Sequence, residues 1–254
     1  MLLEGKKGLV LNVTNDKSIG WAVAKALHEL GATVGVGAQN DRMRERVEAL
    51  VEGFPRMRAH TVDFGEDSQI AALAAEATSS YGKVDFIVHS AAFATKESLS
   101  DPFILTKRED FAMALDVSAY SLVALCRHME PVIADGGSIV AMSYLGSTRA
   151  VVGYNVMGVA KAALESAVRY LACDLGGRGI RVNTVSPGPI NTVSARGVGG
   201  LIEMIDYVHQ KAPLKGTFGQ AEVAGTTAYL VSDLSKGVSG QIVFVDNGYN
   251  VAAM

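Results

Sequence analysis

The composition of the 254-residue chain indicates a protein with a large apolar core. Hydrophobic residues make up 49% of the sequence, and this length is ordinary for one α/β sheet wrapped in helices. Charged residues account for only 19%, below the usual quarter, so we expect other copies of the chain to cover part of the surface. The net charge of −3, without a block of like charge, argues against nucleic acid or a membrane surface as a partner.

The cysteines and the first residues bear on where the protein works. Cys126 and Cys173 stand in apolar runs, not in a metal-binding or redox spacing, and we expect both to be buried helix thiols. The first residues, MLLEGKKGLVLNV, lack the order of a signal peptide. No stretch approaches the ~20 apolar residues of a membrane span. These features predict a cytoplasmic protein without a metal site.

Short runs typical of β-strands alternate along the chain with longer patterns typical of amphipathic helices. The alternation predicts βαβ units, and hence an α/β fold with a Rossmann-like, doubly wound parallel sheet of about seven strands and helices on both faces. The expected strands are Gly8–Val13, Thr33–Gly37, Met57–Thr61, Asp85–His89, Ser138–Met142, Arg181–Val185 and Gln241–Asp246. The expected helices are Ile19–Leu30, Asp41–Val51, Asp67–Tyr81, Glu109–His128, Tyr154–Leu175 and Gln220–Ser232. No linker or repeat interrupts this pattern, so we expect a single domain over residues 1–254.

The first strand leads into a helix that begins near Ile19, and this turn is a candidate phosphate site. A helix N-terminus presents free amides and a partial positive charge, so Ser18 and Ile19 could contact a pyrophosphate. Asn12 stands where the usual dinucleotide fingerprint has its first glycine, and asparagine tolerates the left-handed backbone that such a turn needs. The alternative is a capped surface turn without a ligand.

The ends of the next two strands offer contacts for a nucleoside. After the second strand no acidic residue is available for the adenosine ribose, and the amide of Gln39 is the substitute, with Arg42 the nearest group for a 2′-phosphate. After the third strand, Asp63 could accept from the adenine amino group, with Phe64 beside it. A turn or helix cap is an equally good interpretation of Asp63.

Tyr154 and Lys161 are seven residues apart in a helical pattern, so we expect them to share one face of a helix. The lysine ammonium is expected to lower the pKa of the phenol, which could donate to a carbonyl oxygen while hydride arrives from a nicotinamide. Tyr144, at the end of the fifth strand, adds a second phenol. Pairs at this spacing are common by chance, and the alternative is an amphipathic helix with an exposed lysine and an interfacial tyrosine.

The segment after the sixth strand, SPGPINTVSARGVGGLIEMI, is rich in proline and then in glycine. Backbone groups fixed by Pro187 and Pro189 could bind a carboxamide, and Thr192 could contact a diphosphate. Gly197, Gly199 and Gly200 give the backbone freedom just before an apolar run. We therefore expect a mobile substrate lid around residues 194–210.

Five segments carry a family resemblance: SYLGSTRAVVGYNVMGVAKAALE, GIRVNTVSPGPINT, GAQND, VHSAAFA and the tail GQIVFVDNGYNVAAM. With them the chain resembles the short-chain dehydrogenase/reductase family and, within it, the NADH-dependent enoyl-acyl-carrier-protein reductases of bacterial type II fatty-acid synthesis. The resemblance runs from about Gly5 to Met254. Six residues separate Tyr154 from Lys161, where most of the wider family has three, and this spacing is the mark of the enoyl reductases.

The resemblance implies a reaction and a role for each candidate residue. Tyr154 would stabilise the enolate formed when NADH reduces a trans-2-enoyl thioester of acyl carrier protein, Lys161 would bind the nicotinamide ribose, and Tyr144 would line the acyl site. Cofactor contacts would come, besides Lys161, from Asn12, Ser18, Ile19, Gln39, Asp63, Phe64, Ser90, Ala91, Ile190 and Thr192. The acyl pocket or its lid would be formed by Phe93, Ala94, Tyr144, Met157, Ala195, Val198, Leu201 and Met204. Relatives are homotetramers, so the same assembly is expected here.

Two other functions stay open. A short-chain reductase acting on a ketone or alcohol is disfavoured by the wide Tyr154–Lys161 spacing and by Tyr144. A nicotinamide-binding protein without catalysis is disfavoured by the intact Tyr154–Lys161 pair, although Asn12 and an altered lid favour it. The lid segment GGLIEM lacks the basic residues that relatives present to the acidic carrier protein, and it adds Glu203.

Overall fold

The structure, a computed structural model, describes residues 1–193, 195–197 and 199–252. Its centre is one seven-stranded parallel sheet, as the sequence predicted, and its strand order is β3-β2-β1-β4-β5-β6-β7. The strands are β1 Lys7–Leu11, β2 Thr33–Ala38, β3 Met57–Thr61, β4 Val84–His89, β5 Ile133–Met142, β6 Arg181–Pro187 and β7 Ile242–Val245.

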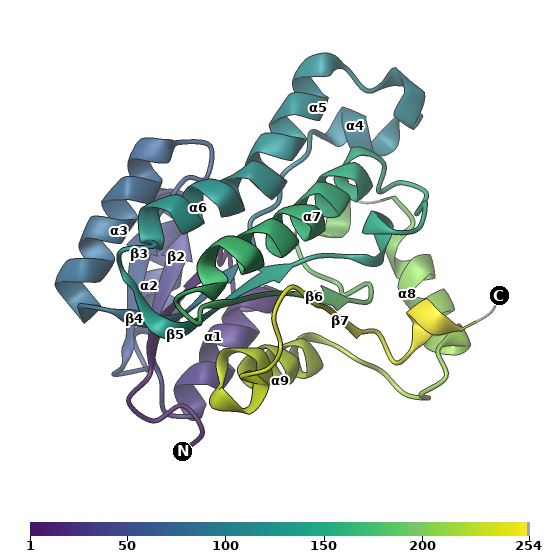
Figure 1. The fold of residues 1–254 in the computed structure, drawn as a ribbon. Coiled ribbons are helices and arrows are strands. Elements are labelled where there is room, and N and C mark those ends of the chain that lie inside the picture. The colour runs from purple at the N-terminus through teal and green to yellow at the C-terminus, as the bar shows by residue number, and fades with distance from the viewer. Residues whose placement is uncertain (194, 198, 253–254) are drawn as a thin grey trace.

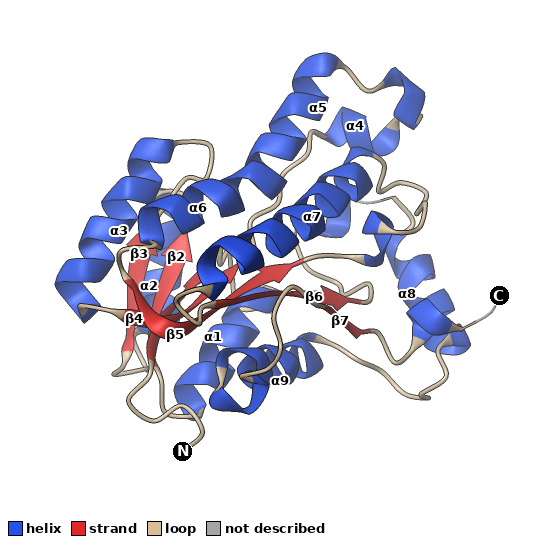
Figure 2. Ribbon diagram, viewed as in Figure 1, coloured by secondary structure: helices blue, strands red, loops and turns tan. Residues whose placement is uncertain are grey.

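Helices cover both faces of the sheet, which gives three layers (Figures 1 and 2). The helices are α1 Ile19–Glu29, α2 Asp41–Val51, α3 Asp67–Tyr81, α4 Lys96–Ser100, α5 Arg108–Leu115, α6 Ser121–Met129, α7 Val156–Gly176, α8 Leu201–Lys211 and α9 Gln220–Val231. One face is covered by α3, α6 and α7, and the other by α1, α2 and α9.

The strands are apolar because their residues alternate between two cores. Leu9 and Leu11 of β1 belong to the cluster under α3, α6 and α7, whereas Val10 belongs to the cluster under α1, α2 and α9. Such apolar runs are expected of a parallel sheet that is buried on both faces. The strand β6, RVNTVSP, is an exception: all its residues are buried, and its polar side chains Arg181 and Asn183 donate to backbone carbonyls.

The strand register aligns the carboxyl ends of the central strands. Leu11 pairs with His89, His89 with Ala141, and Ala141 with Thr184. The residues that follow these positions therefore meet at one edge of the sheet. In doubly wound sheets ligands bind at this edge.

The helices differ from the prediction in three regions. The single helix expected over Glu109–His128 consists of α5, a π-helical turn over Asp116–Tyr120, and α6. Within the π turn the hydroxyl of Ser118 accepts from the amide of Phe93 at 3.0 Å. This contact joins distant segments, so a local sequence pattern does not predict it. Most of the segment expected only as a lid forms α8, whose Leu201 and Val208 are buried. The short helix α4 was not predicted, because five residues carry too little periodicity.

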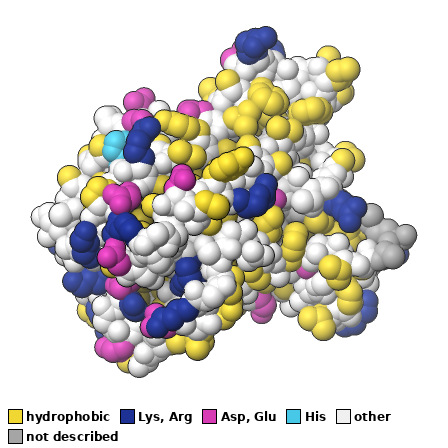
Figure 3. Space-filling model, in the orientation of Figure 1, with side chains coloured by type: hydrophobic (Ala, Val, Ile, Leu, Met, Phe, Trp, Pro, Cys, Tyr) yellow, Lys and Arg dark blue, Asp and Glu magenta, His cyan; other side chains and the backbone are white. Residues whose placement is uncertain are grey.

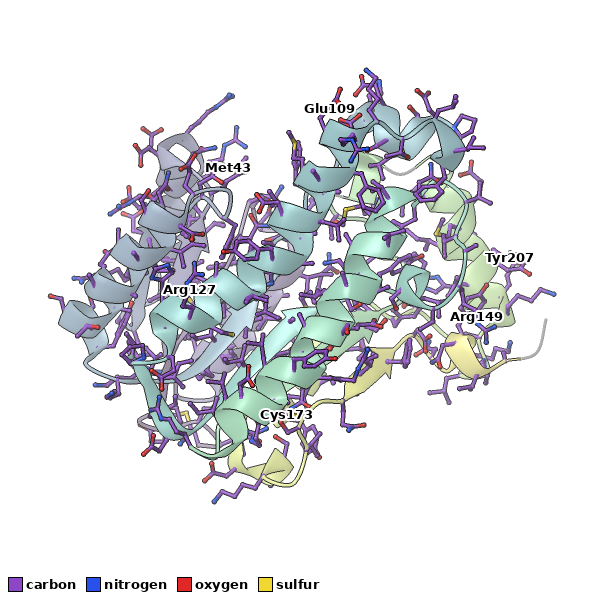
Figure 4. The ribbon with its side chains drawn as sticks, turned by 45° about the horizontal axis from the view of Figure 1, so that its top comes forward. Met43, Glu109, Arg127, Arg149, Cys173 and Tyr207 are labelled. Carbon is purple, nitrogen blue, oxygen red and sulfur yellow. The ribbon has the colours of Figure 1, made fainter. Side chains whose placement is uncertain are left out.

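The two cysteines lie in different environments. Cys126 is buried in α6, and burial raises the pKa of its thiol to about 12. Cys173 is exposed on the outer side of α7 (Figure 4), so the expectation of two buried thiols was wrong for this residue. Its segment is apolar because neighbouring residues such as Leu171 and Leu175 point inwards. Among the described residues, no helix combines the length and the apolarity needed to cross a bilayer.

Candidate active site

A cavity of about 500 Å³ lies at the carboxyl edge of the sheet. Its walls come from the segments after β4, β5 and β6 and from α8. The lining residues that the sequence predicted as site residues are Ile19, Phe93, Ala94, Tyr144, Tyr154, Met157, Ile190, Thr192, Ala195, Leu201 and Met204. The structure thus brings the two phenols, the nicotinamide-side candidates and the substrate-side candidates to one cavity. Val198, also predicted for the substrate side, lies outside the described residues.

The two phenols stand side by side in this cavity. The ring centroids of Tyr144 and Tyr154 are 4.7 Å apart, with 62° between the ring planes. The hydroxyl of Tyr144 donates to Met204 Sδ at 3.1 Å, which connects the site to α8. Gly146 allows this close arrangement, because a Cβ there would lie 2.5 Å from Cδ1 of Tyr154.

Tyr154 belongs to a turn and not to the helix that the sequence predicted from this residue onwards. The helix α7 begins at Val156, and Asn155 just before it has a positive φ of 44°. The side chain of Asn155 donates to three backbone carbonyls at the end of α4. This anchor redirects the chain before α7, so Tyr154 and Lys161 do not share two turns of one helix.

Lys161 lies beneath the cavity, with only 4% of its surface exposed. Its Nζ donates to the carbonyl oxygen of Met142, the last residue of β5, at 2.7 Å. One helical turn further, Glu165 is equally buried and accepts from the hydroxyl of Ser143 at 2.5 Å. Burial lowers the pKa of Lys161 to about 8, and the nearby Glu165 carboxylate opposes this shift.

The phenols have raised pKa values, contrary to the expectation that Lys161 lowers the pKa of Tyr154. Burial raises the pKa of Tyr154 well above its usual value, and neighbouring Tyr144 raises it further. Burial likewise raises the pKa of Tyr144 to about 12. The ammonium of Lys161, which donates to Met142 O at the end of β5, does not offset these effects. Both phenols are therefore protonated near neutral pH and can act as hydrogen-bond donors.

The turn after β1 has the backbone that the sequence predicted. Asn12 has a φ of 66°, in the left-handed region, and its side-chain amide donates to Ser90 O at 3.1 Å. The hydroxyl of Ser90 donates in return to Leu11 O, so the ends of β1 and β4 are joined. Ser18 is the N-cap of α1 and accepts from Trp21 N. A Cβ on Gly20 would lie 3.0 Å from Val13 and 3.3 Å from Ser90, so this glycine lets α1 start close to the strands.

The candidates for the adenosine half lie along the same edge, away from the cavity. Gln39 directly follows β2 and is partly buried. After β3, Asp63 accepts from the amide of Gly65, which is the turn interpretation, while Phe64 is buried against the ring of His89. Ala91, in the loop after β4, is buried. These positions form a row across the sheet rather than one pocket.

The residues along this edge fit a dinucleotide. A capped helix with free first-turn amides follows β1, and Gly20 lets this helix start close to the strands. Amide, carboxylate and hydroxyl groups follow at Gln39, Asp63 and Thr192, and a buried ammonium ends the row at Lys161. No metal-binding group of His, Cys, Asp and Glu occurs among the residues that the structure describes.

Four residues at or near the site escaped sequence reasoning. Lys96 and Leu99 line the cavity from α4, and Ser143 lines it from the end of β5, where Glu165 holds it. One signal was available for Glu165, since an acidic residue four positions after Lys161 lies on the same helix face. The sequence of α4 itself does not indicate that it belongs to the site. Its position there depends on the hydrogen bond from Asn155, which is distant in the sequence.

The fold and the site are those of the short-chain dehydrogenase/reductase class. They combine a parallel sheet, a cavity at its carboxyl edge, a pair of tyrosines and a buried lysine. A family profile described as Enoyl-(Acyl carrier protein) reductase matches residues 13–250. The chain is 43% identical over 253 residues to Enoyl-[acyl-carrier-protein] reductase [NADH] 1 of Rhizobium meliloti (strain 1021), covering 100% of this chain and 93% of that protein. It is 43% identical over 250 residues to an enoyl-[acyl-carrier-protein] reductase [NADPH] of Staphylococcus aureus (strain MRSA252), covering 98% of each.

A solved structure is similar over the whole chain. The Bacillus cereus enoyl-acyl carrier protein reductase, crystallised with NADP+ and indole naphthyridinone, superposes with a TM-score of 0.97 at 39% identity, covering 100% of this chain and 99% of that one. The chain therefore belongs to the enoyl-(acyl carrier protein) reductase family.

Proposed function

We propose that the protein reduces the trans-2 double bond of an enoyl thioester on acyl carrier protein, with NADH as the hydride donor. The observation that carries this proposal is the pair of protonated phenols, Tyr144 and Tyr154, in an apolar cavity above the buried Lys161. An apolar cavity suits an acyl chain, and a neutral phenol suits a carbonyl that gains negative charge.

In this proposal each side chain has one task. Tyr154 donates to the thioester carbonyl and stabilises the enolate oxygen, after which a proton reaches the α-carbon. Lys161 binds the nicotinamide ribose, and Tyr144 orients the acyl group from the neighbouring wall. The nicotinamide, when bound, supplies hydride to the β-carbon. Met204, which accepts from Tyr144, keeps this second phenol turned towards α8.

The remaining candidates divide between cofactor and substrate. The proposed cofactor contacts, besides Lys161, are Asn12, Ser18, Ile19, Gln39, Asp63, Phe64, Ser90, Ala91, Ile190 and Thr192. The proposed acyl contacts, besides Tyr144, are Phe93, Ala94, Met157, Ala195, Val198, Leu201 and Met204. The Asn12 amide and the Ser90 hydroxyl are engaged with each other's strands, so their contribution is to shape the turn.

The deciding experiment mixes the protein with NADH and a crotonyl thioester and follows the loss of nicotinamide absorbance at steady state. Carrier-protein and coenzyme A thioesters are compared side by side. Turnover of the crotonyl thioester, and none of a β-ketoacyl thioester or a simple ketone, supports the proposal. Reduction of the ketone instead would identify a carbonyl reductase, and NADH binding without any turnover would identify a non-catalytic protein.

We expect NADH to be preferred over NADPH, with kcat/KM higher by at least about tenfold, or ~1.4 kcal/mol. Gln39 is neutral, Asp41 adds a carboxylate at the start of α2, and Arg44 is paired with Glu48 at 2.9 Å. A 2′-phosphate would thus meet only the exposed Arg42. Steady-state kinetics with both cofactors measure this ratio. Gln39→Arg should reduce the ratio of the two kcat/KM values, because it adds a cation for the 2′-phosphate. Equal kcat/KM values in the unmodified protein would show that Arg42 binds the phosphate.

We expect the lid proposed around residues 194–210 to become more ordered when cofactor and an apolar ligand are both bound. Leu201 and Met204 of α8 line the cavity, whereas Ile202 on the same helix is half exposed. An apolar ligand would extend the buried face of α8. Amide hydrogen exchange in α8 should slow in the ternary complex and much less with NADH alone. Unchanged exchange with both ligands would contradict a lid.

We expect a homotetramer, held in part by the outer face of α5, α6 and α7. Hydrophobic side chains gather over these helices (Figure 3), including the exposed Phe111, Tyr120 and Tyr170. Between them lies a groove lined by Ala112, Leu115, Asp116, Ala119, Tyr120, Val123, Ala163 and Ala167. A second copy of the chain suits this self-complementary apolar face, and closed symmetry then permits four copies. Light scattering should give four times the chain mass, and Ala167→Arg in the groove should give smaller species. A monomeric unmodified protein at micromolar concentration would refute the assembly.

We also propose a cytoplasmic location. Its support is the pair of free cysteines, Cys126 and Cys173, which form no disulfide. Cell fractionation with a compartment marker is the measurement.

A further inference from the structure

The cavity has one charged side chain among its described lining residues. That residue is Lys96, the first residue of α4, and the others are apolar or neutral and polar. Lys96 is exposed, and its side chain makes no hydrogen bond or ion pair with any residue that the structure describes. Its ammonium therefore stands at the solvent side of a neutral cavity without an anionic partner.

The helix that carries Lys96 is fixed to the catalytic turn. Asn155, the neighbour of Tyr154, donates through Nδ2 to the carbonyls of Ser98, Leu99 and Asp101 at 3.4, 3.1 and 2.9 Å. At the other end of α4, the side chain of Thr95 caps the helix by accepting from Ser98 N. Since both ends of α4 are tied, the backbone of Lys96 has a defined position relative to the phenol of Tyr154.

The helix α8 carries acidic side chains that do not line the cavity. Leu201 and Met204 of α8 line the cavity, while Glu203 and Asp206 of the same helix are exposed to solvent. In Figure 1, α4 and α8 lie at the same end of the molecule. The ammonium of Lys96 attracts an anion at the mouth of the cavity. The exposed carboxylates of Glu97 and Asp101 at α4, and those of α8, repel it, so the attraction is confined to the immediate surroundings of Lys96.

We infer that Lys96 binds the phosphate of the 4′-phosphopantetheine arm that carries the enoyl group. This inference rests on the proposed function. An enoyl chain in the apolar cavity, with its thioester at Tyr154, sends the polar arm out past the mouth, where its phosphate is an anion. A lysine ammonium is a common point-charge partner for phosphate. Carrier protein and coenzyme A share this arm, so Lys96 recognises a group common to both.

The test uses two small thioesters that differ only in this phosphate, crotonyl-4′-phosphopantetheine and crotonyl-pantetheine. Lys96→Met should raise KM for the phosphorylated thioester roughly three- to tenfold, as for one exposed charge-assisted contact, with kcat unchanged. KM for crotonyl-pantetheine should stay the same. Lys96→Arg should restore most of the affinity. Lys107→Met is the matched control, because this exposed lysine lies outside the cavity lining and should affect neither substrate.

Each other outcome overturns the inference. Equal effects on both thioesters would mean that Lys96 acts on the cavity and not on phosphate. An equal rise in KM for the phosphorylated thioester in Lys107→Met would mean that the phosphate is attracted by the general positive charge of this surface and not by Lys96 in particular. A loss seen only with crotonyl acyl carrier protein would indicate a protein–protein contact. No turnover of any crotonyl thioester by the unmodified enzyme would overturn the proposed function itself, whereas intact turnover with unchanged KM values in Lys96→Met would overturn only the role of Lys96.

Discussion

Tyr154→Phe should lower kcat by roughly 100- to 1,000-fold, the cost of ~2.7–4 kcal/mol expected for loss of one oxyanion donor. The hydroxyl is the group proposed to strengthen its bond as negative charge develops on the thioester oxygen, so its loss acts on the transition state. The NADH dissociation constant should stay nearly unchanged, because the phenol is not proposed to hold the ribose. Steady-state kinetics and a fluorescence titration with NADH measure the two quantities separately.

Tyr144→Phe is the matched control. It removes the neighbouring hydroxyl, which donates to Met204, and leaves both aromatic rings in place. Its effect on kcat should be smaller than that of Tyr154→Phe. The reverse order of the two effects would make Tyr144 the hydrogen-bond donor to the thioester oxygen. If Tyr154→Phe weakens NADH binding as strongly as turnover, the phenol holds the cofactor and its proposed role is wrong.

The sheet was predictable because its physical cause is local. Most strands buried on both faces are apolar runs, and the long helices between them carry one apolar stripe, so these elements can be recognised from a few consecutive residues. The left-handed Asn12 was also predictable, because few residues tolerate that backbone. For the sheet and for Asn12, the residues that carry the sequence pattern are the same residues that adopt the predicted structure.

The parts of the site that escaped prediction depend on contacts between distant segments. The turn that holds Tyr154 depends on Asn155 reaching α4, more than fifty residues away. A helix pattern through Tyr154 ignores that anchor, and so it placed the phenol on α7. The raised pKa of Tyr154 likewise comes from burial and from Tyr144, neither of which is visible in the spacing to Lys161.

Lys161→Ala should weaken NADH binding as well as turnover, unlike Tyr154→Phe. Lys161 is buried beneath the cavity and is the residue proposed to bind the nicotinamide ribose directly. The substitution also leaves Met142 O without its donor and Glu165 without the nearest cation, so the melting temperature of the variant must be measured first. We expect the NADH dissociation constant to rise by about tenfold or more, or ~1.4 kcal/mol per factor of ten.

Lys161→Arg keeps the charge and separates its effect from that of shape. It should recover part of the NADH affinity, although a planar guanidinium and a compact ammonium differ in geometry. The two proteins should also differ in their response to pH. Burial lowers the pKa of Lys161 to about 8, so the ammonium is present below that pH and is lost above it. NADH affinity of the unmodified enzyme should therefore fall as the pH rises through about 8, while that of Lys161→Arg should stay level. A folded Lys161→Ala variant that binds NADH normally, beside a Tyr154→Phe variant that does not, would reverse the two assignments.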